Sequence, residues 1–230
     1  MHSWIVKQNF MQASKATADF IAEKIIQTLD GRASCHIALP GGNTPAECLS
    51  LLAEKNLPWQ QLHFYLGDER CYPEYHKERN DVMLEKNLLA KIPATNFYRI
   101  PAELGPEQAA LAYQKIIDEL THLDIAFLGM GEDGHTASLF PDNPALDDPH
   151  SVVPVHNAPK PPDERVSLSL STLKEARYRV VLSTGESKAP ILSKIQQGEK
   201  LPVNCIGDIN WFVDEAAYTL CSSEAKVENS

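Results

Sequence analysis

Long apolar runs, paired cysteines and an excess of basic charge are all missing from this sequence of 230 residues. No segment approaches the ~18 consecutive apolar residues that cross a membrane, and residues 1–7 lack the basic and apolar regions of a secretory signal. The five cysteines lie far apart without a C-x-x-C pair, so the sequence predicts neither a disulfide framework nor a zinc ribbon. These absences indicate a cytoplasmic protein with no membrane partner.

Basic residues are outnumbered, with 21 Lys and Arg against 31 Asp and Glu and a formal net charge of -10. Nucleic acids and anionic membranes bind to basic faces, so we expect neither as a partner. Hydrophobic residues make up 43% of the chain and are evenly spread, which excludes a disordered protein. An anionic ligand would require the few basic side chains to gather at one place.

Short apolar runs alternate with amphipathic helical patterns along the chain. The patterns predict strands at 35–39, 62–66, 123–128, 166–170, 178–183 and 211–213, and helices at 14–29, 46–54, 81–90, 106–120 and 189–196. This order is typical of a parallel sheet with helices on both faces. We therefore predict a single α/β domain over residues 1–230, with a Rossmann-like, mostly parallel sheet. The proline-rich stretch 141–162 is expected to be a long surface connection within that domain.

A glycine-rich turn follows the first of these strands and opens a helix. In Pro40-Gly41-Gly42-Asn43-Thr44-Pro45 the glycines allow close backbone approach, and the free N–H groups at the helix start suit a phosphate. A tight turn with a helix cap explains the segment equally well. Neither G-x-x-x-x-G-K-[ST] nor G-x-G-x-x-G is present, so a nucleoside triphosphate or a dinucleotide lacks its main support.

Two basic residues near other strand ends could hold an anion. Arg165 starts a predicted strand, where its guanidinium could bind a phosphate through two hydrogen bonds; an edge-strand charge is the alternative. Lys188 lies in the first turn of a predicted helix. A cation there opposes the helix dipole, which an anion bound nearby would explain. Taken alone, a solvated surface lysine is the more common explanation of such a residue.

The loop Gly67-Asp68-Glu69-Arg70 follows the second strand. Adjacent side chains alternate in direction in extended backbone, so the three charged residues cannot all face one ligand. An Asp–Arg pair that holds the loop is the simpler interpretation. The other is that Asp68 or Arg70 contacts a substrate, with further polar groups from Arg79 and Asn80.

A third polar loop, 129–138, surrounds one aspartate and one histidine with three glycines directly after a buried strand. His135 can take and return a proton near neutral pH, although a capping or packing role is the alternative. A metal site from Asp68, Asp133 and His135 is conceivable, but the spacing matches no usual ligand motif. No G-x-S-x-G elbow is present, which argues against a serine nucleophile.

In order and spacing, these segments resemble the 6-phosphogluconolactonases over nearly the whole chain. The segments that carry the resemblance are Leu39-Pro40-Gly41-Gly42-Asn43-Thr44-Pro45, Gly67-Asp68-Glu69-Arg70, Gly129-Met130-Gly131-Glu132-Asp133-Gly134-His135-Thr136-Ala137-Ser138-Leu139-Phe140-Pro141, Arg165-Val166-Ser167-Leu168 and Gly185-Glu186-Ser187-Lys188. The third is the most specific, whereas the glycine turn and Gly-x-x-Lys are shared with glucosamine-6-phosphate deaminases. The resemblance implies hydrolysis of 6-phosphoglucono-1,5-lactone in the oxidative pentose phosphate pathway, without a metal or an organic cofactor. Its partner would be this small phosphorylated sugar lactone, and we expect a monomer or a weak homodimer.

The resemblance also implies a role for individual residues. His135 would be the general base, with Asp133 as the second catalytic residue. Asp68, Arg70 and Asn80 would lie on the lactone side or order the loop. The implied phosphate ligands are Gly41, Gly42, Asn43, Thr44, Arg165 and Lys188.

One segment departs from the family pattern. The family's first motif usually reads Ser-Gly-Gly-Ser-Thr-Pro, whereas here Pro40 and Asn43 replace the two serines. The first replacement removes both a hydroxyl and a backbone N–H. It leaves the glycine turn intact but changes which groups of the loop can meet a phosphate.

Two other functions remain open. The related deaminases carry a glutamate five residues after the loop histidine, where this chain has Phe140, which cannot relay a proton; their proton-abstracting aspartate is matched by Asp68. A phosphosugar sensor that binds without catalysis is the second alternative. Sensors of this kind usually carry a DNA-binding segment, and the sequence shows no helix-turn-helix pattern.

Overall fold

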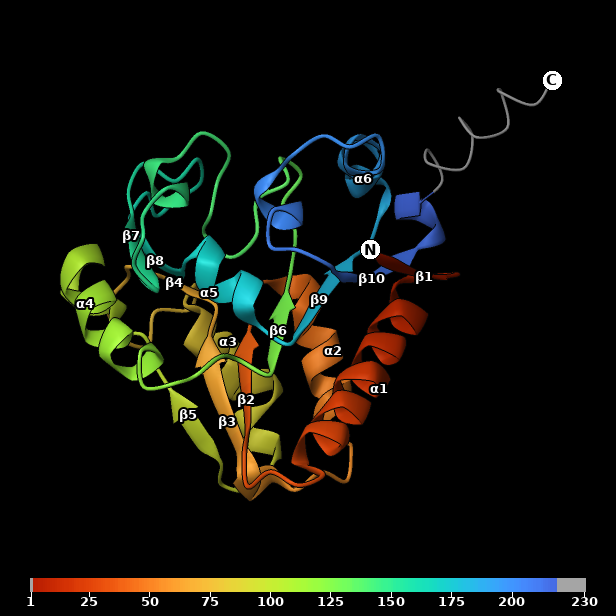
Figure 1. Ribbon diagram of the computed structural model, residues 1–230, viewed down its shortest axis with the longest axis horizontal. Coiled ribbons are helices and arrows are strands. Elements are labelled where there is room, and N and C mark those ends of the chain that lie inside the picture. Colours follow the sequence, from red (N-terminus) through yellow and green to blue (C-terminus); the bar gives the residue numbers. More distant parts are fainter. Residues whose placement is uncertain (1, 219–230) are drawn as a thin grey trace.

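Seven strands form the central sheet of the protein, seen in a computed structural model that describes residues 2–218 (Figure 1). Their order across the sheet is β1 (Ser3–Lys7), β10 (Asn210–Asp214), β9 (Tyr178–Ser183), β6 (Ile125–Leu128), β2 (Cys35–Leu39), β3 (Leu62–Leu66) and β5 (Asn96–Tyr98). All neighbouring pairs are parallel, which confirms the predicted sheet. The short outer strands β1 and β5 were not predicted.

Helices connect the strands and cover both faces of the sheet, as predicted. They are α1 (Phe10–Leu29), α2 (Asn43–Ala53), α3 (Asn80–Asn87), α4 (Pro106–Ile117), α5 (Leu170–Glu175) and α6 (Ala189–Gln196). In the view of Figure 1, α2 and α3 lie behind the sheet and α5 lies in front of it. The α/β class and the Rossmann-like arrangement are therefore confirmed.

Polar caps explain two boundaries that the apolar pattern misplaced. Helix α1 begins four residues before the predicted start because the Asn9 side chain accepts a hydrogen bond from the Gln12 N–H. The strand predicted at 166–170 ends at Leu168, because Ser169 caps α5 and accepts a hydrogen bond from the Thr172 N–H. Both caps satisfy backbone donors at a helix start.

A second, antiparallel sheet was not predicted. Its order is β4 (Asp68–Arg70), β8 (Arg165–Leu168) and β7 (Val152–Val155). The loop expected at 67–70 is thus largely a strand, and the expected connection 141–162 contains another. Three charged residues carry no strand pattern of their own, so β4 owes its conformation to pairing with β8.

The topology places a crevice between β2 and β6. These neighbouring strands pair through Ile37 with Ile125 and Ala38 with Ala126. The strands β3 and β5 extend the sheet on the side of β2, whereas β9, β10 and β1 extend it on the side of β6. The loops that leave β2 and β6 therefore diverge, and ligands of open α/β sheets bind at such a point.

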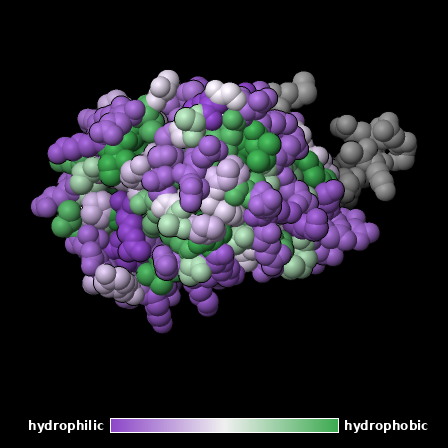
Figure 2. All heavy atoms as spheres, turned by 90° about the horizontal axis from the view of Figure 1, so that it is seen from below, coloured by the Kyte–Doolittle hydropathy of each residue, from purple (hydrophilic) through white to green (hydrophobic). Residues whose placement is uncertain are grey.

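The surface at the end of the sheet away from this crevice is mainly hydrophilic, with separate apolar patches (Figure 2). Among the described helices, none is long and apolar enough to span a membrane. Four cysteines, Cys35, Cys48, Cys71 and Cys205, are free, and the fifth, Cys221, lies outside the described residues.

Helix α2 offers a test of the core, because it carries the glycine turn at its start. Leu49 on this helix is 0% exposed, whereas Leu111 on α4 is 62% exposed. We expect Leu49→Ala to lower the free energy of unfolding by about 2–5 kcal/mol, because it leaves a cavity. The chemically identical Leu111→Ala should change that free energy by less than about 0.5 kcal/mol. If urea titrations gave the two variants the same loss in free energy of unfolding, the assigned packing would be wrong.

Candidate active site

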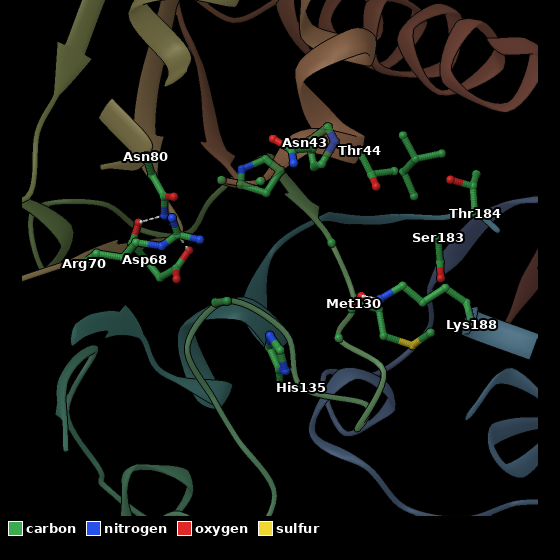
Figure 3. Close-up of a pocket in the computed structure, with 18 of the residues that line it drawn as sticks. Asn43, Thr44, Asp68, Arg70, Asn80, Met130, His135, Ser183, Thr184 and Lys188 are labelled. Carbon is green, nitrogen blue, oxygen red and sulfur yellow. Dashed lines mark hydrogen bonds between the residues drawn. The ribbon is translucent and has the colours of Figure 1, made fainter. Parts of the chain in front are cut away.

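One pocket lies at the carboxyl ends of β2, β6 and β9, beside the crevice (Figure 3). Ten of the eleven predicted site residues line it: Gly41, Gly42, Asn43, Thr44, Asp68, Arg70, Asn80, His135, Arg165 and Lys188. Asp133 lies behind His135 and contacts its ring. Residues from five separate parts of the sequence thus meet in one cavity.

Asp133 holds the imidazole of His135. Its Oδ1 lies 2.5 Å from His135 Nδ1 and also accepts the backbone N–H of His135 at 3.2 Å. A carboxylate at Nδ1 favours the tautomer with the proton on that nitrogen, which leaves a lone pair on Nε2. The ring lies so close to the backbone that a Cβ at Gly131 would overlap it. This glycine is therefore required by close approach.

The charge of Asp133 follows from the same contacts. Burial alone would raise the pKa of this carboxyl, but the hydrogen bonds and positive charge from His135 outweigh it and lower the pKa to about 2. Asp133 is therefore ionised at neutral pH and can stabilise a protonated His135.

A second Asp-x-His unit shows that this local geometry is not sufficient for a site. Asp148 Oδ1 accepts the backbone N–H of His150 at 3.0 Å and lies 2.7 Å from its Nδ1. The side chain of His150 is 61% exposed, against 24% for His135, and it does not line the pocket. The pocket, and not the local hydrogen bond, distinguishes His135.

Phe140 fills the position where the related deaminases carry a glutamate. Its ring centroid lies 4.5 Å from that of His135, at an interplanar angle of 49°. On the same ring, the Arg165 guanidinium carbon lies 5.5 Å from the centroid. An apolar ring thus packs beside the imidazole and offers it no proton-transfer partner.

Asp68 and Asn80 form a hydrogen-bonded group on one side of the pocket (Figure 3). Asp68 is 7% exposed; its Oδ2 accepts the Ser138 hydroxyl at 2.6 Å and its Oδ1 accepts the Asn80 amide at 3.2 Å. Next to them, Arg70 donates to the backbone carbonyl of Glu78 at 2.7 Å. Asp68 and Arg70 both line the pocket, while Glu69 between them does not, which confirms the predicted alternation.

Lys188 lies on the opposite side of the pocket (Figure 3). Its Nζ donates to the backbone carbonyl of Met130 at 2.8 Å, and burial lowers its pKa. It ends a short 3-10 turn, Glu186–Lys188, and caps α6, so the prediction that it lies inside the first turn of that helix is wrong by one residue. The turn starts at Gly185, whose N–H is held by Asp214 Oδ1 at 2.9 Å.

Arg165 belongs to the middle strand of the small sheet and is 7% exposed, so the edge-strand alternative is wrong. Its guanidinium donates to the carbonyl of Lys160 at 2.9 Å and to that of Pro162 at 3.2 Å. Burial lowers its pKa, while the charge of Asp68 acts in the opposite direction. Three cations, Arg70, Arg165 and Lys188, and a single carboxylate, that of Asp68, line the pocket, which therefore gathers basic charge as an anionic ligand requires.

Sequence reasoning missed several pocket residues. Ser183, Thr184 and Met130 line the cavity, and Ser138 orients Asp68. The Oγ of Ser183 is buried and has no hydrogen-bond partner. Its place at the end of β9, directly before Thr184 and the turn at Gly185, is the signal that could have identified it. Among the described residues, no group of three or more His, Cys, Asp or Glu could hold a metal ion.

Comparison with known proteins agrees with this architecture. The model of the family "Glucosamine-6-phosphate isomerases/6-phosphogluconolactonase" matches residues 9–212. Human 6-phosphogluconolactonase is 35% identical, in an alignment that covers 89% of this chain and 88% of the human protein. The 6-phosphogluconolactonase of Neisseria meningitidis is 30% identical, and the alignment covers 90% of this chain and 94% of that protein. The crystal structure of 6-phosphogluconolactonase from Thermotoga maritima superposes with a TM-score of 0.86 at 27% identity, covering 93% of this chain and 100% of the other.

The chain therefore belongs to the glucosamine-6-phosphate isomerase and 6-phosphogluconolactonase family. Within this family it is similar to the 6-phosphogluconolactonases, which are lactone hydrolases. A monomeric glucosamine-6-phosphate deaminase also superposes with a TM-score of 0.83, but at 19% identity, over 95% of this chain and 99% of the other. That likeness concerns the fold alone, so the choice between the two activities depends on the site.

The Asp133–His135 contact predicts a pH dependence. Because the folded pKa of about 2 lies below the ordinary value of about 3.9, the ionised carboxylate stabilises the fold above pH ~4, and this contribution is lost as the pH falls toward 2. In His135→Ala the side-chain hydrogen bond and the charge of the imidazole disappear while the backbone N–H and the burial remain, so the pKa of Asp133 should rise. Carbon-13 NMR titration of the carboxyl would measure this, with Asp148 as the control. An unchanged pKa of Asp133 would contradict the pairing.

Proposed function

We propose that this protein hydrolyses 6-phosphoglucono-1,5-lactone to 6-phosphogluconate in the oxidative pentose phosphate pathway. The observation that carries the proposal is a histidine oriented by an ionised carboxylate in a pocket lined by three basic side chains. The names of its relatives support the substrate. Neither a metal nor an organic cofactor enters the proposed reaction.

The imidazole of His135 acts as the general base. Its Nε2 takes a proton from a water molecule, whose oxygen attacks C1 of the lactone and forms a tetrahedral intermediate. When that intermediate collapses, the bond from C1 to the ring oxygen breaks and the imidazolium returns the proton to this oxygen. The carboxylate of Asp133, 2.5 Å from Nδ1, stabilises the transient positive charge on the ring. Backbone N–H groups of the glycine loops are candidate donors to the developing oxyanion.

The phosphate of the substrate binds on the side of Lys188. Arg165, which pairs with Arg70 between β4 and β8, adds a second cation from across the pocket. The N–H groups of Gly41 and Gly42 and the side chains of Asn43 and Thr44 complete this subsite. Helix α2 starts at Asn43, so its free N–H groups and positive end favour an anion. On the other side, Asp68, Arg70 and Asn80 contact the lactone hydroxyls or order the loop around them. Binding energy from the remote phosphate orients C1 over the imidazole.

The packing of Phe140 favours hydrolysis over the deaminase reaction. A deaminase on this scaffold opens a sugar ring with help from a glutamate beside the histidine, and here an apolar ring occupies that place at 4.5 Å. The oriented histidine likewise favours catalysis over a sensor that only binds. Release of ammonia from glucosamine 6-phosphate by the protein would support the deaminase activity instead.

Three further properties are part of the proposal. The chain acts as one lactonase domain over residues 1–230, supported by the family match over residues 9–212. The four free cysteines in the described part of the chain support a cytoplasmic location. The proposed oligomeric state is a monomer or a weak homodimer.

Removal of the base is the central test of this function. We expect His135→Ala to lower kcat for the lactone by about 10²–10⁴-fold, because the water loses its general base. Binding of 6-phosphogluconate and the melting temperature should stay close to wild type. Lactone loss followed by proton NMR, corrected for spontaneous hydrolysis, gives the rate.

The control for this variant is His150→Ala, which removes the same Asp-x-His contact away from the pocket. It should leave kcat unchanged. Near-normal turnover in His135→Ala would contradict the role of His135 as the general base. A wild-type protein that binds the sugar phosphate without speeding hydrolysis would be a sensor.

The phosphate subsite can be tested with two substrates. We expect Lys188→Met to raise KM for the phosphorylated lactone about tenfold or more, because a charge-assisted contact is lost. KM for unphosphorylated glucono-1,5-lactone should barely change. Lys194→Met on α6 is the control, since its side chain is 55% exposed and does not line the pocket. Equal effects on both substrates would contradict a phosphate contact at Lys188.

A further inference from the structure

Glu69 is a fully buried carboxylate directly beneath the pocket. It is 0% exposed and does not line the cavity, although both neighbours in the sequence do. Its two oxygens accept three backbone N–H groups: Arg70 at 2.8 Å, Asn80 at 2.7 Å and Asp81 at 2.9 Å. One side chain therefore joins β4 to the start of α3.

The residues that Glu69 holds are those that form one side of the pocket. Asn80, fixed through its backbone N–H, donates its side-chain amide to the Asp68 carbonyl at 2.8 Å and to Asp68 Oδ1 at 3.2 Å. The same amide lies against Gly41, where an added Cβ would overlap it. A movement of the start of α3 would thus reach Asp68 and the glycine turn together.

A buried cation makes the buried carboxylate tolerable. Arg79 is 2% exposed, and its Nε lies 3.9 Å from Glu69 Oε2. The guanidinium is fixed by Asp81 at 2.9 Å, by Glu103 at 2.9 Å and by the carbonyls of Tyr72 and Ile100. Burial raises the pKa of Glu69 to about 7, while the three backbone donors act in the opposite direction. The carboxylate is needed in its ionised form, since each of its contacts is a donor.

We propose that Glu69 is a positioning residue, which acts on the substrate through Asn80 and Arg70 by fixing the backbone of β4 against the start of α3. This inference rests on the proposed function of the same pocket. Two geometric facts carry it: the three N–H donors converge on one carboxylate, and they belong to residues that line the pocket or directly follow one. A purely structural ion pair would not need to bind the backbone of two pocket residues.

The test begins with Glu69→Gln, which keeps the size of the side chain. Its amide supplies one acceptor and one donor, so an N–H group must face a backbone N–H and at least one of the three contacts is lost. We expect kcat/KM for the lactone to fall about tenfold or more, since hydrogen bonds to a charged group are strong. The fold should persist at 25 °C, as checked by circular dichroism.

Glu103→Gln is the matched control. Glu103 also pairs with Arg79, at 2.9 Å, but it touches no residue that lines the pocket. Its substitution weakens the same buried cation without releasing α3, so kcat/KM should stay within about twofold of wild type. If the two variants lose equal activity, Glu69 supports only the ion pairs of Arg79 and the proposal is wrong.

A double-mutant cycle separates positioning from stability. If Glu69 acts through Asn80 and Arg70, the loss of kcat/KM caused by Glu69→Gln should be clearly smaller when Asn80→Ala is already present, because one of the two routes has then been removed. Undiminished loss in that background would overturn the proposal. Should Glu69→Gln fail to fold, Glu69→Asp serves in its place, because it keeps the charge but withdraws the carboxylate by one methylene.

The outcome is separable from that of the proposed function. If the wild-type protein does not accelerate lactone hydrolysis, the proposed reaction is wrong, and Glu69 is then tested by its effect on the affinity for 6-phosphogluconate in calorimetry. If the wild type is active and Glu69→Gln matches it in both kcat/KM and this affinity, only the positioning role fails.

Discussion

The parallel pairing of β2 with β6 is the constraint on which the rest of the structure depends. Because these neighbours lie where the order of the sheet diverges, the loops after them open away from each other at one edge. The glycine turn at 40–45 and the histidine loop at 129–138 are those two loops. Had β6 been placed elsewhere in the sheet, His135 and the start of α2 would not face one cavity.

Electrostatics then determines what this cavity can accept. A chain with a net charge of -10 repels polyanions over most of its surface, but fields of exposed charges are screened within roughly 8 Å at physiological salt. Arg165 is buried and Lys188 partly buried at the pocket, where their charges are screened less, and the helix start at Asn43 adds a positive end. The pocket can therefore attract a small dianion within an acidic protein.

Carboxylates of two kinds support this cationic pocket: Asp133 is partly exposed, whereas Glu69 is fully buried. Asp133 is ionised because His135 donates a hydrogen bond to it, and the same hydrogen bond orients the imidazole. Glu69 instead binds backbone N–H groups and fixes a strand to a helix. In the proposed reaction, the first carboxylate acts on the group that moves the proton, and the second on the frame around the substrate.

The sequence by itself determined the class of fold and three inner strands to the residue (β2, β3 and β9), because apolar periodicity and glycine loops are local signals. Ten lining residues followed from the motifs that the sequence shares with its family. Other features depended on tertiary contacts. The small sheet exists because β4, with three charged residues, finds β8 far along the chain. Ser183 lines the pocket because β9 lies next to β6 in the sheet. His150 makes the same local contact with an aspartate as His135 does, but it does not line the pocket. Local pattern fixes what a segment can become, whereas long-range pairing decides which segments meet, and only the folded chain supplies that pairing.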